Sequence, residues 1–167
     1  MIMNTSNTLI ANCHFDKSSY LYLHQNEVCV PDTLRELIVC CNPHTSLEVG
    51  CGLCGFSSYL TGQGIRTTTI CSIDKLNMLA TLFDISFDTS YFHCLCEEEH
   101  ERYVSELYRL LKHQGVHLLW ALDSTPSNLK LTSEYIAKTF GQKFHLVGSE
   151  YSKKKNKASH WYWLIRR

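Results

Sequence analysis

Long apolar runs are missing from this sequence, and no stretch reaches the roughly 18 consecutive apolar residues that a membrane span requires. Proline is scarce, at three residues in a chain of 167, and no low-complexity tract or obvious linker interrupts the chain. The first twelve residues show no basic segment followed by a long apolar stretch, so no secretory signal is predicted. We therefore expect a single cytoplasmic domain over residues 1–167, with an N-terminal covering segment at 1–29 and a core at 30–167.

Net charge is also missing, because 16 lysines and arginines balance 16 aspartates and glutamates. The balance hides an asymmetry: residues 143–167 hold seven basic residues and one acid, so they carry +6 and residues 1–142 carry −6. A basic end of this kind can contact an anion, but a short run of lysines is usually a solvated loop. No broad basic face is indicated, and we expect neither a nucleic-acid nor a membrane partner.

The cysteine pattern of a structural metal site is incomplete. The nine cysteines are an odd number without a secretory signal, which argues against a disulfide framework. Cys51 and Cys54 form a C-x-x-C pair inside a glycine turn, and no second pair follows, so a structural zinc site is not expected. We expect no metal and interpret most of the cysteines as reduced, small apolar side chains.

The sequence does contain an alternation of strand and helix patterns. A helix is predicted after Pro31, with Thr33 and Glu36 as its capping box and Cys41 on its apolar face. A strand, a glycine loop, a helix and a strand that ends at an acid then form a βαβ unit, which is typical of an α/β fold with a parallel sheet. The predicted strands are Ser46–Val49, Thr67–Ile73, Leu82–Asp88 and Val116–Leu122. The later helices are predicted at Phe56–Leu60, at Glu97–Lys112, where Gly115 stops the helix, and at Ser133–Phe140. An antiparallel pair of strands is predicted at 143–150 and 159–167.

The loop after the first predicted strand contains Gly50-x-Gly52-x-x-Gly55. Glycines let the backbone turn tightly and let a ligand come close, and the N-terminus of the following helix aims N–H groups at that ligand. Glu48 disfavours a pyrophosphate but suits a ligand ammonium group, and Asp74 at the end of the next strand suits ribose hydroxyls. An ammonium group and a ribose without phosphate favour S-adenosylmethionine over a dinucleotide. The alternatives are a purely structural turn for the glycine loop and Glu48, and an N-cap of a short helix at Leu76–Leu79 for Asp74.

The segment Leu47-Glu48-Val49-Gly50-Cys51-Gly52 resembles the first motif of class I S-adenosylmethionine-dependent methyltransferases. A second block, from Phe83 through the helix to Gly115, resembles the fourth strand, loop, helix and turn of the branch that holds thiopurine and tellurite-resistance methyltransferases. Pro31-Asp32-Thr33-Leu34 also fits this branch. The resemblance covers roughly residues 30–167. It implies a Rossmann-like methyltransferase fold, α/β, with a mostly parallel sheet and a C-terminal antiparallel hairpin.

The resemblance also implies a cofactor site at the ends of the first, second and fourth strands of that fold. The glycine motif and its acid would surround the methionine part of S-adenosylmethionine, and the acid after the second strand would hold the ribose. The acid that ends the fourth strand would line the cleft near the methyl donor. The implied cofactor-binding residues are Glu48, Gly50, Cys51, Gly52, Asp74 and Asp88.

The loop after the fourth strand would face the substrate. Tyr91 and Phe92 are the predicted substrate-binding residues. Asp88 and His93 are the candidate catalytic residues, as proton acceptors for a thiol or hydroxyl substrate. The alternatives are that Asp88 caps loop amides and that His93 is a surface or packing residue.

Two departures from the family pattern matter. Cys54 stands where the family has its third glycine. Seven residues, 75–81, stand where the family has a helix, a third strand and another helix, and a crossover needs a dozen or more residues. We therefore expect a sheet without its third strand, in which the family order 3-2-1-4-5-7-6 becomes 2-1-4-5-7-6. The second strand becomes an exposed edge, which favours a homodimer through that edge or through a domain swap.

Two functions follow from this pattern. The first is an S-adenosylmethionine-dependent methyltransferase that acts on a small molecule, at sulfur or another soft nucleophile, for which orientation matters more than a strong base. The second is a catalytically degenerate methyltransferase fold that works as a binding or interaction module. Retention of Glu48, Gly50, Gly52 and Asp74 favours the first function, and loss of the third strand favours the second.

Overall fold

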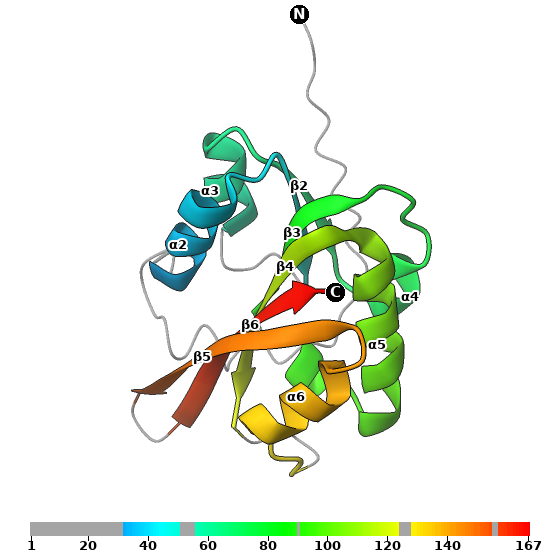
Figure 1. Cartoon of the computed structure of the whole chain (residues 1–167), viewed down its shortest axis with the longest axis vertical. Coiled ribbons are helices and arrows are strands. Elements are labelled where there is room, and N and C mark those ends of the chain that lie inside the picture. The colour runs from blue at the N-terminus through cyan, green and yellow to red at the C-terminus, as the bar shows by residue number, and fades with distance from the viewer. Residues whose placement is uncertain (1–31, 51–55, 90, 124–127, 155–156) are drawn as a thin grey trace, which may run out of the picture.

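A six-stranded sheet with the order β2-β1-β3-β4-β6-β5 forms the centre of the molecule (Figure 1). The computed structural model describes residues 32–50, 56–89, 91–123, 128–154 and 157–167. The pairs β1–β2, β1–β3 and β3–β4 are parallel, and the pairs β4–β6 and β5–β6 are antiparallel. The strands are β1 (Thr45–Val49), β2 (Arg66–Ile70), β3 (Phe83–Asp88), β4 (Leu111–Leu122), β5 (Phe144–Lys154) and β6 (Lys157–Arg166).

The strand order confirms the predicted loss of the third strand. The expected order 2-1-4-5-7-6 corresponds strand for strand to the observed one, and the last two strands form the expected antiparallel hairpin. Along β6, Trp161 packs into the core on one face of the sheet and Tyr162 into the core on the other. This alternation follows from the two-residue period of a strand.

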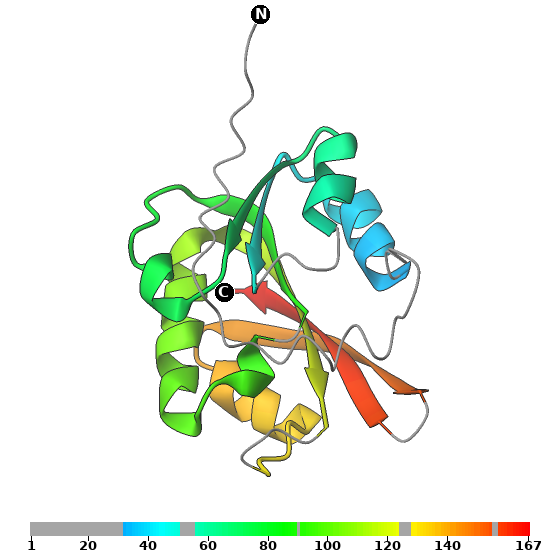
Figure 2. The same ribbon diagram turned by 180° about the vertical axis from the view of Figure 1, so that it is seen from behind.

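Helices cover both faces of the sheet (Figures 1 and 2). Helices α2 and α3 lie on one face, where Phe87 and Trp120 belong to the apolar core. Helices α4, α5 and α6 lie on the other, where Val49 and Leu119 belong to a second core. A sheet buried on both faces is typical of parallel α/β folds. The helices are α2 (Asp32–Cys41), α3 (Phe56–Gly62), α4 (Ile73–Leu76), the 3₁₀ turn η1 (Phe92–Cys94), α5 (Glu97–Leu110) and α6 (Ser133–Phe140).

Two predicted boundaries are wrong. Helix α5 ends just before Leu111, where β4 begins, so Gly115 lies inside a strand and does not stop the helix. Strand β2 ends at Ile70, because Ser72 caps a new helix and its hydroxyl accepts a hydrogen bond from the N–H of Asp74 at 3.3 Å. Asp74 therefore lies in the first turn of α4 and not at the end of a strand.

The start of α2 also differs from expectation. Helix α2 begins at Asp32, so Thr33 lies within its first turn and is not the capping residue. The Thr33 hydroxyl donates to the Glu150 carboxylate at 2.9 Å and ties α2 to β5. None of the described cysteines is in a disulfide, which agrees with the interpretation of reduced side chains, and Cys71 is buried whereas Cys40, Cys41, Cys94 and Cys96 are exposed.

Residues 77–82 connect α4 directly to β3, where the family has its third-strand unit. Arg109 of α5 holds this connection, because its guanidinium donates to the main-chain oxygens of Leu76 at 2.8 Å and Leu79 at 2.7 Å. Among the described residues, strand β2 lies at the edge of the sheet. The predicted position of β2 at the edge of the described sheet is therefore confirmed. The short connection of residues 77–82, held by Arg109, takes the place of a crossover.

Candidate functional site

The carboxyl ends of β1, β2 and β3 meet at one edge of the sheet. The register places Val49 of β1 beside Ile70 of β2 and beside Asp88 of β3. The strand order reverses here, since the chain runs from β1 out to β2 and returns to β3 on the other side of β1. Ligands of open α/β sheets bind outside the carboxyl ends of the strands at such a switch point. This edge is therefore the candidate ligand site.

Glu48 lies on β1, and its side chain is 1% exposed on the sheet face that α3 covers. The hydroxyls of Ser57 and Thr69 both donate to its Oε2 atom, the second at 3.0 Å. Burial raises the pKa of Glu48, and the two hydroxyl donors oppose that rise. A carboxylate held by two neutral donors at a strand tip retains the capacity to accept hydrogen bonds from a cationic ligand group.

Gly50 makes the turn out of β1 with φ at +126°, a conformation that residues with a Cβ rarely adopt. Its N–H donates to the carbonyl of Ile70 at 2.7 Å and so ties the turn to β2. A Cβ added at Gly50 would meet the Cβ of Tyr91 at 3.7 Å, which is ordinary contact. The backbone conformation, and not crowding, therefore calls for glycine. The predicted residues Cys51 and Gly52 lie outside the described residues, as does the segment 1–29.

Asp88 ends β3 and is fully buried. Its Oδ1 atom accepts from the N–H of Tyr91 at 2.6 Å, and its Oδ2 atom accepts from the N–H of Phe92 at 2.9 Å. The Tyr103 hydroxyl also donates to Oδ2, at 2.6 Å. These contacts match the alternative that sequence reasoning left open, in which Asp88 caps loop amides. Its role toward a cofactor or a reacting proton stays a prediction.

A buried hydrogen-bond chain continues from Asp88 into the sheet, and sequence reasoning missed it. The Tyr103 hydroxyl lies 3.2 Å from Nε2 of His117, and Nδ1 of His117 lies 2.8 Å from the Ser86 hydroxyl. Because Tyr103 donates its proton to Asp88, it accepts from His117, so Nε2 carries the imidazole proton and Nδ1 accepts from Ser86. Burial lowers the pKa of His117 to about 3, which keeps the imidazole neutral as this arrangement requires.

One feature of the sequence indicates this chain of hydrogen bonds. His117 stands in the otherwise apolar strand segment Val116–Leu122, and a polar ring at a buried strand position needs hydrogen-bond partners. The identity of the partners has no local signal, because Ser86, Tyr103 and His117 come from β3, α5 and β4.

The residues that follow Tyr91 in the loop after β3 point into the molecule. Phe92 is fully buried, and its ring stacks on His100 with centroids 4.1 Å apart. Phe92 therefore packs in the core, and its role as a substrate-binding residue stays a prediction. His93 is 3% exposed, and its ring meets Trp120 edge-on at 5.9 Å. Packing, the alternative for His93, therefore describes its position, and its catalytic role stays a prediction.

Asp74 lies in the first turn of α4 and is exposed. Its side chain is 75% exposed and pairs with Arg102 of α5 at 2.8 Å. The N–H of the preceding residue, Ile73, donates to the Tyr91 hydroxyl at 2.7 Å. Tyr91 therefore joins the loop after β3 to the start of α4, and its side chain reaches the candidate site. The predicted contact between Asp74 and a ribose stays a prediction.

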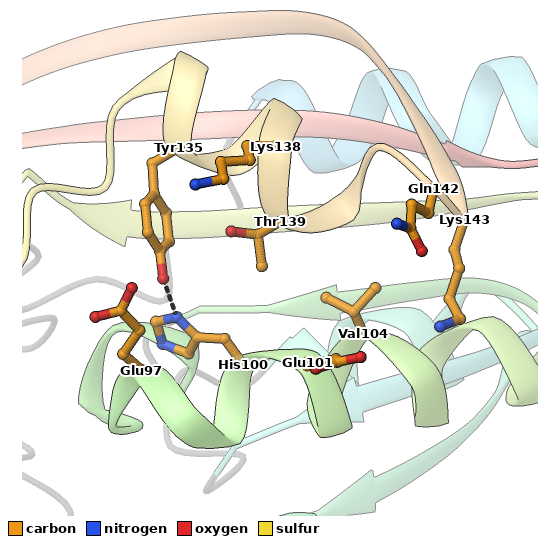
Figure 3. Close-up of a pocket in the computed structure, with 9 residues that line it drawn as sticks. All are labelled: Glu97, His100, Glu101, Val104, Tyr135, Lys138, Thr139, Gln142 and Lys143. Carbon is orange, nitrogen blue, oxygen red and sulfur yellow. Dashed lines mark hydrogen bonds between the residues drawn. The ribbon is translucent and has the colours of Figure 1, made fainter.

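A pocket of about 330 Å³ lies between α5 and α6 (Figure 3). Two glutamates of α5 line it together with Lys138 and Lys143, and the His100 and Tyr135 side chains hydrogen bond beside them at 2.8 Å. The described residues that line this pocket include no predicted site residue. The pocket is thus separate from the strand-end site.

Neither a membrane-spanning helix nor a cluster of metal-ligating side chains occurs in the part of the chain that the structure describes. No helix there is long and apolar enough to cross a membrane. No group of three or more His, Cys, Asp or Glu side chains there is placed to hold a metal ion.

No protein-family model matches the sequence, and no curated protein matches it. Solved structures do match the fold. The 1,6-didemethyltoxoflavin-N1-methyltransferase of Burkholderia thailandensis has a TM-score of 0.68 at 14% identity, over 81% of this chain and 77% of that chain. The magnesium protoporphyrin IX methyltransferase ChlM of Synechocystis PCC 6803 has a TM-score of 0.68 at 14% identity, over 95% and 90%. TehB of Haemophilus influenzae has a TM-score of 0.61 at 13% identity, over 89% and 66%.

These likenesses confirm the fold that the sequence motifs implied. The chain has a Rossmann-like α/β fold that is similar to the folds of these methyltransferases. At 13–14% identity the likeness extends to the fold alone.

Proposed function

We propose that this protein is an S-adenosylmethionine-dependent methyltransferase that acts on a small molecule, at sulfur or another soft nucleophile. The observation that carries the proposal is the buried carboxylate of Glu48 beside the left-handed turn of Gly50, at the switch point of a methyltransferase-like sheet. The toxoflavin and protoporphyrin methyltransferase structures that the fold resembles were solved with S-adenosylhomocysteine bound. That observation supports the choice of cofactor.

The described residues suit the methionine end of such a ligand. The two hydroxyl donors to Glu48 both meet Oε2, so Oε1 is the oxygen that we assign to the ligand's ammonium group. Gly50 presents main chain without a Cβ at the turn, which permits close approach. The part of the site that would bind the ribose is less well arranged for a ligand, because the Asp74 carboxylate must break its ion pair with Arg102 before it can bind the ribose hydroxyls.

The proposed chemistry depends on orientation. S-adenosylmethionine, when bound, supplies a methyl group activated on a sulfonium. Well-oriented reactions gain up to ~7–11 kcal/mol from proximity. Asp88 contributes by fixing the N–H groups of Tyr91 and Phe92, and hence the loop beside the cleft. With three donors on its carboxylate, Asp88 has little capacity left as a base, which favours a soft nucleophile such as a thiolate over a substrate that needs deprotonation.

Calorimetric titration with S-adenosylmethionine and S-adenosylhomocysteine tests the proposal. We expect micromolar binding to the wild-type protein, and at least about tenfold weaker binding to Glu48→Gln, which loses the charge but keeps an oxygen for Ser57 and Thr69. Glu134→Gln, at an exposed position on α6, is the matched control and should bind like wild type. Absence of binding to the folded wild-type protein at millimolar ligand would overturn the proposal.

The second candidate function is a binding module of the same fold that no longer catalyses. Two observations favour it: the sheet lacks the third-strand unit, and both candidate catalytic side chains, Asp88 and His93, are buried. Incubation with S-adenosylmethionine and a panel of small thiols separates the two functions. Formation of methylated thiol and S-adenosylhomocysteine supports the enzyme, whereas cofactor binding without transfer to any member of the panel favours the binding module.

A further inference from the structure

Tyr91 lies across the end of β1. Its Cβ atom lies 3.7 Å from the position that a Cβ of Gly50 would take, so the side chain starts directly over the turn out of β1. Its hydroxyl accepts a hydrogen bond from the N–H of Ile73 at 2.7 Å, at the start of α4. The side chain therefore spans from the loop after β3, past the end of β1, to the residues that follow β2.

We propose that Tyr91 controls access to the strand-end site: its side chain covers the end of β1 in the ligand-free protein and swings away when a nucleoside-type ligand binds. This inference rests on the proposed function. A ligand whose ammonium group meets Glu48 and whose ribose lies beyond the end of β2 must pass over Gly50. The Tyr91 ring follows the same path in the opposite direction. The ring and such a ligand compete for one space.

The main chain and the side chain of Tyr91 are held by different contacts. Its N–H donates to Asp88 at 2.6 Å, and Asp88 is held in turn by the Tyr103 hydroxyl. The ring is half-buried, and it faces the Tyr103 ring at a centroid distance of 6.4 Å with 30° between the planes. Rotation about the Cα–Cβ bond releases the hydroxyl from Ile73 and leaves the bond to Asp88 intact. The main-chain bond to Asp88 and the hydroxyl bond to Ile73, which we call the latch, are therefore separate contacts.

The closed state lowers the apparent affinity for the ligand. A ligand that binds the open state alone has an apparent affinity reduced by the fraction of molecules that are open. One neutral hydrogen bond and the contacts of a half-buried ring correspond to a closed state favoured about five- to tenfold. Removing the side chain removes the closed state, so affinity should rise by this factor.

The experiment compares Tyr91→Ala and Tyr91→Phe with wild type by calorimetric titration with S-adenosylhomocysteine, together with hydrogen exchange of the Ile73 amide measured by NMR. We expect Tyr91→Ala to bind about five- to tenfold more tightly. We expect Tyr91→Phe, which keeps the ring, to bind slightly more tightly and to exchange the Ile73 amide at least about tenfold faster. Saturating ligand should also speed this exchange in wild type. Tyr151→Ala and Tyr151→Phe, at an exposed tyrosine of β5, should change neither quantity.

Each outcome decides a separate point. Weaker binding by Tyr91→Ala, in a protein that still unfolds cooperatively, overturns the gate and makes Tyr91 a wall of the site. Unchanged Ile73 exchange in Tyr91→Phe also overturns it, because the latch is then not a contact of the folded protein. Binding by Tyr91→Ala with none by wild type supports a strong gate. Faster Ile73 exchange in Tyr91→Phe, without binding by any variant, supports the latch and overturns the proposed function instead.

Discussion

His117 shows how one buried residue links stability to pH. Its imidazole is fully buried, and burial lowers its pKa from an ordinary 6.5 to about 3. Between these two values the unfolded chain binds a proton on His117 and the folded chain does not. Stability is therefore fully present above pH 6.5 and falls as the pH falls through this window, by up to about 1.4 kcal/mol per pH unit. His100, whose pKa burial also lowers, adds a loss of the same sign.

The free energy of unfolding, measured with urea at about pH 7 and about pH 5, should thus drop by on the order of 2 kcal/mol because of His117. His117→Gln does not titrate, and its amide can still donate to Tyr103, so this variant should lose that part of the drop. His145→Gln, at an exposed position of β5, should keep the wild-type dependence on pH. An unchanged pH dependence in His117→Gln would show that the buried imidazole is not its source.

At the scale of the elements, Gly115 marks where β4 leaves its regular path. A Cβ there would lie 2.7 Å from the Lys112 carbonyl oxygen and 3.1 Å from the Asp84 carbonyl oxygen. Neither backbone oxygen can move without disturbing the β3–β4 pair, whose register shifts at this point. Gly115→Ala should therefore destabilise the protein by about 1–3 kcal/mol. Thermal unfolding should show this as a fall in Tm of several degrees.

Gly62 provides the matched control for that substitution. It ends α3, and nothing lies within 4 Å of an added Cβ. Gly62→Ala should leave Tm unchanged or raise it, because alanine favours the helix by up to about 1 kcal/mol. Equal Tm values for the two variants would contradict the role assigned to Gly115.

The elements themselves could largely be predicted from the sequence. The alternation of strand and helix patterns, together with the shortness of residues 75–81, leaves few topologies, and the observed order is among them. Glu48 and Gly50 could be placed because a strand and its tight turn are local features. The helical position of Asp74 and the burial of Phe92 could not be predicted. Their positions depend on where β2 stops and on how the loop after β3 packs against α5, which are tertiary effects.

At the scale of the whole molecule, the lost third strand leaves β2 as an edge. Arg66 is exposed and Thr67, Thr68 and Thr69 are half-buried along it. An unpaired edge is a template for another chain, and natural proteins commonly protect such edges with lysine. This edge carries no lysine, and the net charge of zero gives copies no long-range repulsion. We propose that two copies pair through β2.

Thr68 is the position at which to test that pairing. The Thr67 and Thr69 hydroxyls bond to Ser46 at 2.7 Å and to Glu48 at 3.0 Å, so both side chains lie on the face that α3 covers. Thr68 lies on the opposite face by the alternation of the strand. Thr68→Lys therefore adds a charge to the edge without removing a donor from Glu48.

Sedimentation equilibrium over a range of concentrations should show wild type approaching twice the chain mass of 19.3 kDa and Thr68→Lys remaining at the mass of one chain. Ser149→Lys, which places the same charge on the opposite edge strand β5, should associate like wild type. A wild-type protein that stays monomeric throughout would overturn the dimer. A Thr68→Lys variant that still dimerises would place the interface elsewhere. Thr68 is at the centre of the five-residue strand β2. If two copies paired through the main chain of β2, the lysines of the two copies would come together, and like charges that face each other across a strand pair are destabilising.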